Sequence, residues 1–137
     1  MKKRSKKLTA LAVLALILFA LCLSGCSKYK SKYKAVGFVH SNTSGSAFMT
    51  FYEFDGTMVF KLQNRKGMEG QVEYSAKLET GNAAVYYDLG GTKTELFSIR
   101  EGEEVSSTLG LKGSGTVYMI VQTDGKCQNG EFRFDIK

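Results

Sequence analysis

The chain has 137 residues, with 19 basic and 13 acidic side chains and a formal net charge of +6. Five of the basic residues lie within residues 1–25, and the part from Ala35 onward has 10 basic against 13 acidic residues. A mildly acidic domain lacks the broad basic face by which nucleic acid is usually bound, so we expect no nucleic-acid partner. Two of the three Cys, Cys22 and Cys26, lie within the first 26 residues, so the rest of the chain offers one His and one Cys. These are too few for a zinc site, and we expect no metal and no other cofactor.

The N-terminal 27 residues have the layout of an export signal. Residues 1–7 are basic, residues 8–23 are apolar except for Thr9, and small residues precede Cys26. This order of a basic, an apolar and a small-residue region is typical of a secretory signal peptide, and the basic start stays on the cytoplasmic side. Residues 8–27 are uncharged over about the 20 residues that a spanning helix needs, so an uncleaved transmembrane helix is the alternative.

The tetrapeptide Leu23-Ser24-Gly25-Cys26 resembles the lipobox of bacterial lipoproteins. The resemblance implies that signal peptidase II cuts between Gly25 and Cys26 and that the Cys26 thiol carries a diacylglyceryl group. We therefore expect an apolar signal helix in residues 1–25 and a mature chain fixed to membrane lipid through Cys26. It would lie on the extracytoplasmic face of the cell membrane, or in the outer membrane if the cell has one.

Residues 26–46 are predicted to form a basic and polar tether. They contain a tandem repeat, Ser27-Lys28-Tyr29-Lys30 followed by Ser31-Lys32-Tyr33-Lys34. In one interpretation Lys28, Lys30, Lys32 and Lys34 rest on anionic headgroups at the membrane surface. In the other, the repeat is a solvated spacer that its own charge keeps extended. Residues 35–40 also alternate like a strand, so they belong either to this tether or to the domain as its first strand.

Residues 47–137 are predicted to form an all-β domain. The clearest strand is residues 71–79, where Val72, Tyr74, Ala76 and Leu78 share one face and polar residues occupy the other. Similar runs cover residues 47–54, 57–63, 83–89, 93–100, 105–111, 116–123 and 131–136. Seven or eight strands in about 100 residues favour an antiparallel β-sandwich, with a small closed β-barrel as the alternative. In this general architecture the domain resembles small lipoprotein β-sandwiches.

Glycine-containing segments between these runs predict tight turns. Asp55-Gly56 and Gly81-Asn82 are expected to close two hairpins, since both pairs adopt positive φ readily. Residues 124–130 are expected to form an exposed turn, which would make Cys127 an incidental free thiol.

The domain carries no motif that predicts catalysis. His40 precedes a Ser- and Asn-rich loop without a nucleophile elbow, and the acids Glu101, Glu103 and Glu104 form a charged loop. We therefore expect no catalytic residue and no enzyme, with a small carboxylate-dependent envelope hydrolase as one alternative.

Two tyrosines are candidates for ligand stacking. Tyr86 and Tyr118 are out of phase with the apolar residues of their strands and would point outward. The sequence thus predicts an extracytoplasmic lipoprotein with a non-catalytic binding domain, whose partner is an envelope protein or a glycan. A dedicated carbohydrate-binding domain is the other alternative.

Overall fold

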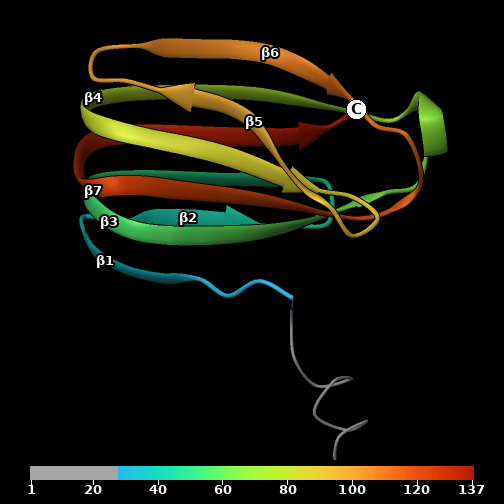
Figure 1. The fold of residues 1–137 in the computed structure, drawn as a ribbon, viewed down its shortest axis with the longest axis horizontal. Coiled ribbons are helices and arrows are strands. Elements are labelled where there is room, and N and C mark those ends of the chain that lie inside the picture. The colour runs from blue at the N-terminus through green and yellow to red at the C-terminus, as the bar shows by residue number, and fades with distance from the viewer. Residues whose placement is uncertain (1–27) are drawn as a thin grey trace, which may run out of the picture.

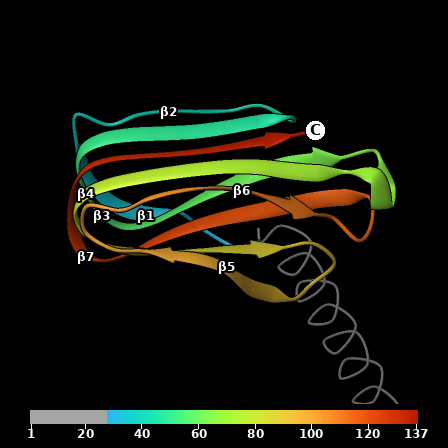
Figure 2. The same ribbon diagram turned by 90° about the horizontal axis from the view of Figure 1, so that it is seen from above.

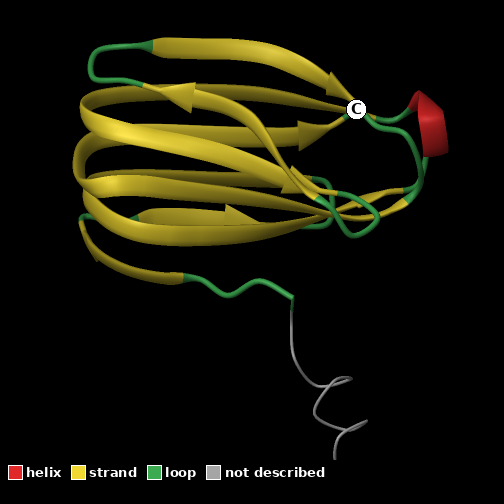
Figure 3. Ribbon diagram, viewed as in Figure 1, coloured by secondary structure: helices red, strands yellow, loops and turns green. Residues whose placement is uncertain are grey.

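A computed structural model describes residues 28–137 (Figure 1). The predicted signal peptide, its cleavage site and Cys26 lie outside these residues. Residues 28–137 form seven strands: β1 (Lys32–Val36), β2 (Val39–Asn42), β3 (Ser46–Asn64), β4 (Gln71–Asp88), β5 (Lys93–Ile99), β6 (Glu104–Gly110) and β7 (Gly115–Ile136). A 3-10 turn, η1 (Gly67–Glu69), joins β3 to β4 (Figure 3). Within residues 28–137 no helix is long and apolar enough to cross a membrane.

The three long strands β3, β7 and β4 lie side by side, and every strand pair is antiparallel. Each long strand bends near its middle, where the register shifts between Phe54 and Thr57 in β3 and between Thr80 and Asn82 in β4. Figure 2 shows the halves of these strands stacked as two layers. The predicted antiparallel β-sandwich is therefore confirmed, built from strands that continue from one layer into the other.

Layer one contains residues 46–54 of β3, 71–80 of β4 and 127–136 of β7, flanked by β2 and β6. Layer two contains residues 57–64, 82–88 and 115–123 of the same strands, flanked by β5. The end at which the long strands cross between layers is called the bend end. The opposite end, where η1 and the β4–β5 and β6–β7 connections lie, is called the loop end (Figure 1).

The two predicted hairpins are wrong, because β3 and β4 bend at Asp55-Gly56 and Gly81 but continue as strands paired with β7. The glycines are nevertheless required there. Gly56 has φ +137°, and a Cβ on it would lie 2.2 Å from the backbone oxygen of Lys32. Gly81 has φ +97°, and its Cβ would lie 2.7 Å from the Cys127 sulfur. A positive φ and a closely packed backbone indicate that the chain changes direction sharply at a glycine. The sequence does not show whether the strand then folds back on itself as a hairpin or stays paired with the same neighbouring strand.

The exposed turn predicted at residues 124–130 is also wrong, since this segment lies inside β7. Cys127 is fully buried, and its Sγ donates a hydrogen bond to the backbone oxygen of Asn82 at 3.3 Å. Burial raises the pKa of the Cys127 thiol, so the neutral form predominates. Cys127 is a core residue of the bend.

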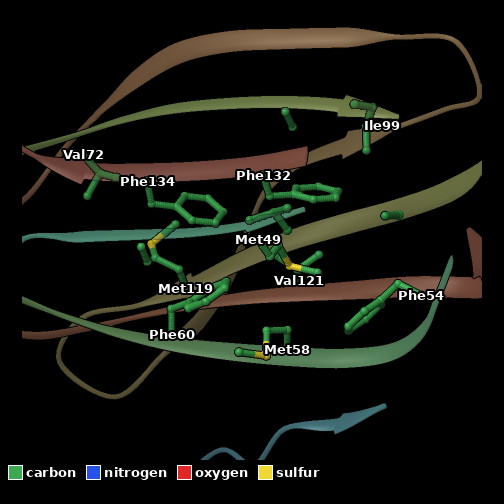
Figure 4. Close-up of a cluster of buried hydrophobic side chains, with 14 of the residues drawn as sticks. Met49, Phe54, Met58, Phe60, Val72, Ile99, Met119, Val121, Phe132 and Phe134 are labelled. Carbon is green, nitrogen blue, oxygen red and sulfur yellow. The ribbon is translucent and has the colours of Figure 1, made fainter. Parts of the chain in front are cut away.

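Alternating side chains from both layers fill the space between them (Figure 4). The faces predicted from residues 71–79 and 131–136 are correct, because Val72, Leu78, Phe132 and Phe134 are all at most 1% exposed. Further core residues are Met49, Phe51, Phe54, Phe60, Leu62, Val85, Val117, Met119 and Val121.

The folded part begins earlier than the boundary drawn at residue 47. Strand β1 pairs with residues 53–57 of β3 and β2 pairs with residues 47–50. The Tyr33 ring stacks on Phe54 with centroids 5.1 Å apart. Residues 32–42 are therefore an edge of the sandwich, in agreement with the alternative that placed residues 35–40 in the domain.

Candidate functional site

The outer faces of the two layers differ in chemistry. On layer one the outward residues of β4 and β7 are polar or charged: Gln71, Glu73, Ser75, Lys77, Glu131, Arg133 and Asp135. On layer two, one cross-strand row is Val59, Ile120 and Tyr86, and the next is Lys61, Tyr118 and Asp88. Ile120 is only 2% exposed although it lies outside the core cluster. The outer face of layer two, where these apolar and aromatic side chains lie among polar ones, is the candidate site.

Residues 28–31 pack against this face and are called the N-terminal latch. The Lys28 Nζ lies 2.8 Å from the Asp88 carboxylate and donates to the Gly91 carbonyl at 2.8 Å. The Tyr29 hydroxyl donates to the same carboxylate oxygen as Lys28. Near the edge of the layer, the Val59 backbone N–H donates to the Ser31 hydroxyl at 2.9 Å. The latch thus fastens the start of the described chain to the end of β4.

Asp88 is the centre of the latch and is 2% exposed. Burial alone would raise its pKa, but hydrogen bonds from Lys28, Tyr29 and the Gly91 amide outweigh burial and lower the pKa below its ordinary value. The same contact with Asp88 raises the pKa of both Lys28 and Tyr29. At neutral pH the latch therefore has an ionised Asp88, a charged Lys28 and a neutral Tyr29.

The half-buried Tyr86 lines an open groove in the bend-end half of the same face. The groove has a volume of about 510 Å³ and is bordered by β4, β5 and β7. Besides Tyr86, its polar lining consists of Asn82, Ser98, Arg100, Gln122, Thr123 and Asp124. The Lys93 ammonium lies 4.3 Å from the centroid of the Tyr86 ring. A ring beside several neutral hydrogen-bonding groups suits a partner that carries both apolar and polar surface.

The structure separates the two tyrosines singled out in the sequence. Both lie on the outer face of layer two, but Tyr118 lies under the latch, where its ring packs against the Tyr29 ring in a T-shaped arrangement with centroids 5.2 Å apart. The Lys61 ammonium lies 5.9 Å from the same ring. Tyr118 thus packs within the protein, and a stacking role for Tyr86 stays a prediction.

The four lysines of the predicted tether also differ from one another. Lys28 is paired with Asp88, whereas Lys30 is exposed, and Lys32 and Lys34 are exposed residues of β1. The latch could not be predicted from the sequence, because no local pattern links Lys28 and Tyr29 to Asp88, about 60 residues further along the chain. The available signal was Tyr29, since a freely solvated spacer does not need an aromatic ring.

Carboxylates on the outer face of layer one are already engaged. Glu73 and Asp135 border a groove of about 380 Å³, where Lys137 lies 3.7 Å from Glu73. The Ser46 hydroxyl donates to Asp135 at 2.7 Å. Within residues 28–137 no three His, Cys, Asp or Glu side chains come together in a group that would hold a metal ion.

No protein-family model matches the chain, and no curated protein matches it. Among solved structures it is similar to PliG, a periplasmic lysozyme inhibitor of g-type lysozyme from Aeromonas hydrophila, with 16% identity over 69% of this chain and 88% of that one and a TM-score of 0.46. It is also similar to TmCBM61 in complex with beta-1,4-galactotriose, with 15% identity, 81% and 88% coverage and a TM-score of 0.45. A third similar structure is that of Bacillus endospore appendages, with 19% identity, 81% and 91% coverage and a TM-score of 0.41. Similarity at this level assigns neither a family nor a function.

Proposed function

We propose that this protein is a lipid-anchored, extracytoplasmic binding protein whose β-sandwich has no catalytic role. The lipobox resemblance of residues 23–26 supports the anchor at Cys26. The binding role rests on one observation, the open groove of about 510 Å³ beside Tyr86. Its lining combines one aromatic ring with amide, hydroxyl and guanidinium groups, and Asp124 is the one carboxylate among them. Such a surface orients a partner by hydrogen bonds but lacks the carboxylate pair that glycoside hydrolysis uses.

Site-specific crosslinking in intact cells tests the groove. A photoreactive amino acid in place of Gln122 lies in the groove, and the matched control at Ser106 lies on the outer face of layer one. We expect a discrete adduct from position 122, and we expect Tyr86→Ala to abolish it without reducing the amount of protein. Adducts of equal yield from both positions, or adducts that persist in Tyr86→Ala, would contradict the proposal.

A hydroxyl-rich glycan is the second candidate for the ligand, favoured by the position of Tyr86. Sugar rings stack on aromatic faces while their hydroxyls bond to groups such as Asn82, Ser98 and Gln122, which border the groove. Binding to defined envelope glycans should fall at least tenfold in Tyr86→Ala, equal to about 1.4 kcal/mol. Tyr52→Ala is the control, because Tyr52 is 55% exposed on strand β3 away from the groove. Equal losses in both variants, or no glycan retention by the unaltered protein, would refute this candidate.

A further inference from the structure

The latch fixes where a lipid anchor would leave the domain. Lys28 binds Asp88 and Gly91, which lie at the loop end where β4 turns toward β5. Only Ser27 separates Lys28 from Cys26 in the sequence. Two residues of extended chain span at most about 7 Å. A lipid on Cys26 would therefore be tethered within that reach of Lys28, close to the loop end of the sandwich.

Several connections meet at the loop end and are tied together by hydrogen bonds. The Asn64 side chain donates to the Gly113 carbonyl at 2.7 Å, which joins the β3–η1 connection to the β6–β7 connection. The Leu111 amide donates to the Gly70 carbonyl at 2.9 Å. These bonds hold the segments around η1 and the β6–β7 connection together at the loop end.

Charge is distributed unevenly between the two ends. Basic side chains at the loop end are Lys28, Arg65, Lys66, Lys93, Lys112 and Lys137, against the acids Glu69, Glu73, Asp88 and Asp135. Asp88 is buried and paired with Lys28. Acidic side chains at the bend end are Glu53, Asp55, Glu79, Glu101, Glu103, Glu104 and Asp124, against Lys32, Lys34, Arg100 and Lys126. The sandwich is therefore positive where the anchor would emerge and negative at the far end.

The loop end also carries an exposed apolar side chain. Met68 in η1 is 80% exposed, more than any other large hydrophobic residue among residues 28–137. In the sequence it follows the basic residues Arg65 and Lys66 and precedes the acidic Glu69. An apolar tip next to Lys and Arg suits contact with a bilayer, because the cations meet anionic headgroups while the apolar group enters the interface.

We propose that the loop end docks on an anionic phospholipid surface and holds the domain upright on the membrane. In this orientation Met68 enters the headgroup region and the acidic bend end points away from the bilayer. The groove beside Tyr86 lies in the bend-end half of layer two and stays open to a partner. This inference rests on the proposed lipid at Cys26. The latch would then hold the lipid attachment site next to the loop end and so keep that end near the bilayer.

Tryptophan fluorescence tests this orientation, because the chain contains no Trp. Met68→Trp places a single reporter at the loop end, and Tyr52→Trp places the matched control on an exposed position near the bend. Lys112→Trp is a second loop-end reporter in case the first variant folds poorly. Each acylated protein is reconstituted into phosphatidylcholine vesicles with and without phosphatidylglycerol, and brominated acyl chains serve as quenchers.

On phosphatidylglycerol vesicles we expect quenching of Met68→Trp to be severalfold stronger than that of Tyr52→Trp. The difference should shrink in pure phosphatidylcholine and when Arg65→Glu and Lys66→Glu are added. Equal quenching of the two reporters, or a difference that does not depend on phosphatidylglycerol, would overturn the proposed orientation. The mass of the Cys26 peptide is measured on each preparation beforehand. A missing acyl group therefore refutes the lipid anchor, whereas an acylated protein with equally quenched reporters refutes only the orientation.

Discussion

Replacing Asp88 by Ala tests whether residues 28–31 are a structural part of the domain. The substitution removes the acceptor for three hydrogen bonds, from Lys28, Tyr29 and the Gly91 amide. The Lys28 side chain is 46% exposed, so solvent screens its ion pair with Asp88 and the pair adds little to the stability of the fold. A hydrogen bond to a charged group contributes about 1.5–3 kcal/mol when buried, and the two remaining bonds are only partly buried. We therefore expect Asp88→Ala to lower the free energy of unfolding by about 2 kcal/mol.

Urea unfolding of the mature protein measures this loss, and the slope m should not change because the same surface is exposed on unfolding. Limited trypsin digestion of the folded protein reports on the latch itself. Cleavage after Lys28 and Lys30 should become faster in Asp88→Ala, while cleavage after Lys32, within β1, keeps its rate. Asp124→Ala is the control, since Asp124 is an exposed strand residue and its replacement should change stability by less than about 0.5 kcal/mol. Unchanged cleavage after Lys28, together with a stability equal to that of the control, would refute the latch.

Three further predictions concern pH, the bend and the buried thiol. Because the folded pKa of Asp88 is lowered, its stabilisation is complete above about pH 4, the ordinary carboxyl pKa, and is lost as the pH falls through the folded value. The difference in unfolding free energy between wild type and Asp88→Ala should therefore be constant from pH 5 to 8 and shrink below pH 4, and a constant difference down to pH 2 would contradict the assignment. Gly81→Ala should destabilise more than Gly90→Ala by about 1–3 kcal/mol in urea unfolding, because the φ values are similar (+97° and +93°) but only Gly81 has neighbours in the way; equal losses would count against a tight bend. Cys127 in the acylated protein should react with a thiol reagent only after unfolding, and rapid labelling of the native state would place it at the surface.

Local patterns predicted the strands well, because the alternation of apolar and polar residues shows which face of a strand is buried whichever strands lie beside it. Val72 and Leu78 in β4 and Phe132 and Phe134 in β7 face the core as expected. The same patterns failed at Asp55-Gly56 and Gly81, where a turn signal was taken for a hairpin. Whether a strand reverses or bends at such a signal depends on its pairing with β7, whose partner residues lie more than 40 positions away in the sequence. The local sequence does not reveal that pairing.

The candidate site could be predicted only in part. Periodicity placed Tyr86 and Tyr118 on an outer face, and the structure brings both to the same face of layer two. The different surroundings of the two rings could not be predicted, because Tyr118 is covered by Tyr29, which lies 89 positions earlier in the chain. The latch depends on the same kind of distant contact, between Lys28 and Asp88. The repeat of Ser, Lys and Tyr shows that the segment is charged and carries amphipathic rings, but it does not show which part of the domain those side chains contact.

Mass spectrometry of the protein isolated from its native membrane tests the anchor most directly. We expect the N-terminal peptide to begin at Cys26 and to carry the added mass of a diacylglyceryl group. The same measurement on a Cys26→Ala variant should find the full precursor without lipid. A native chain that still begins at Met1, or one that begins at Cys26 with no acyl group, would refute the lipid anchor.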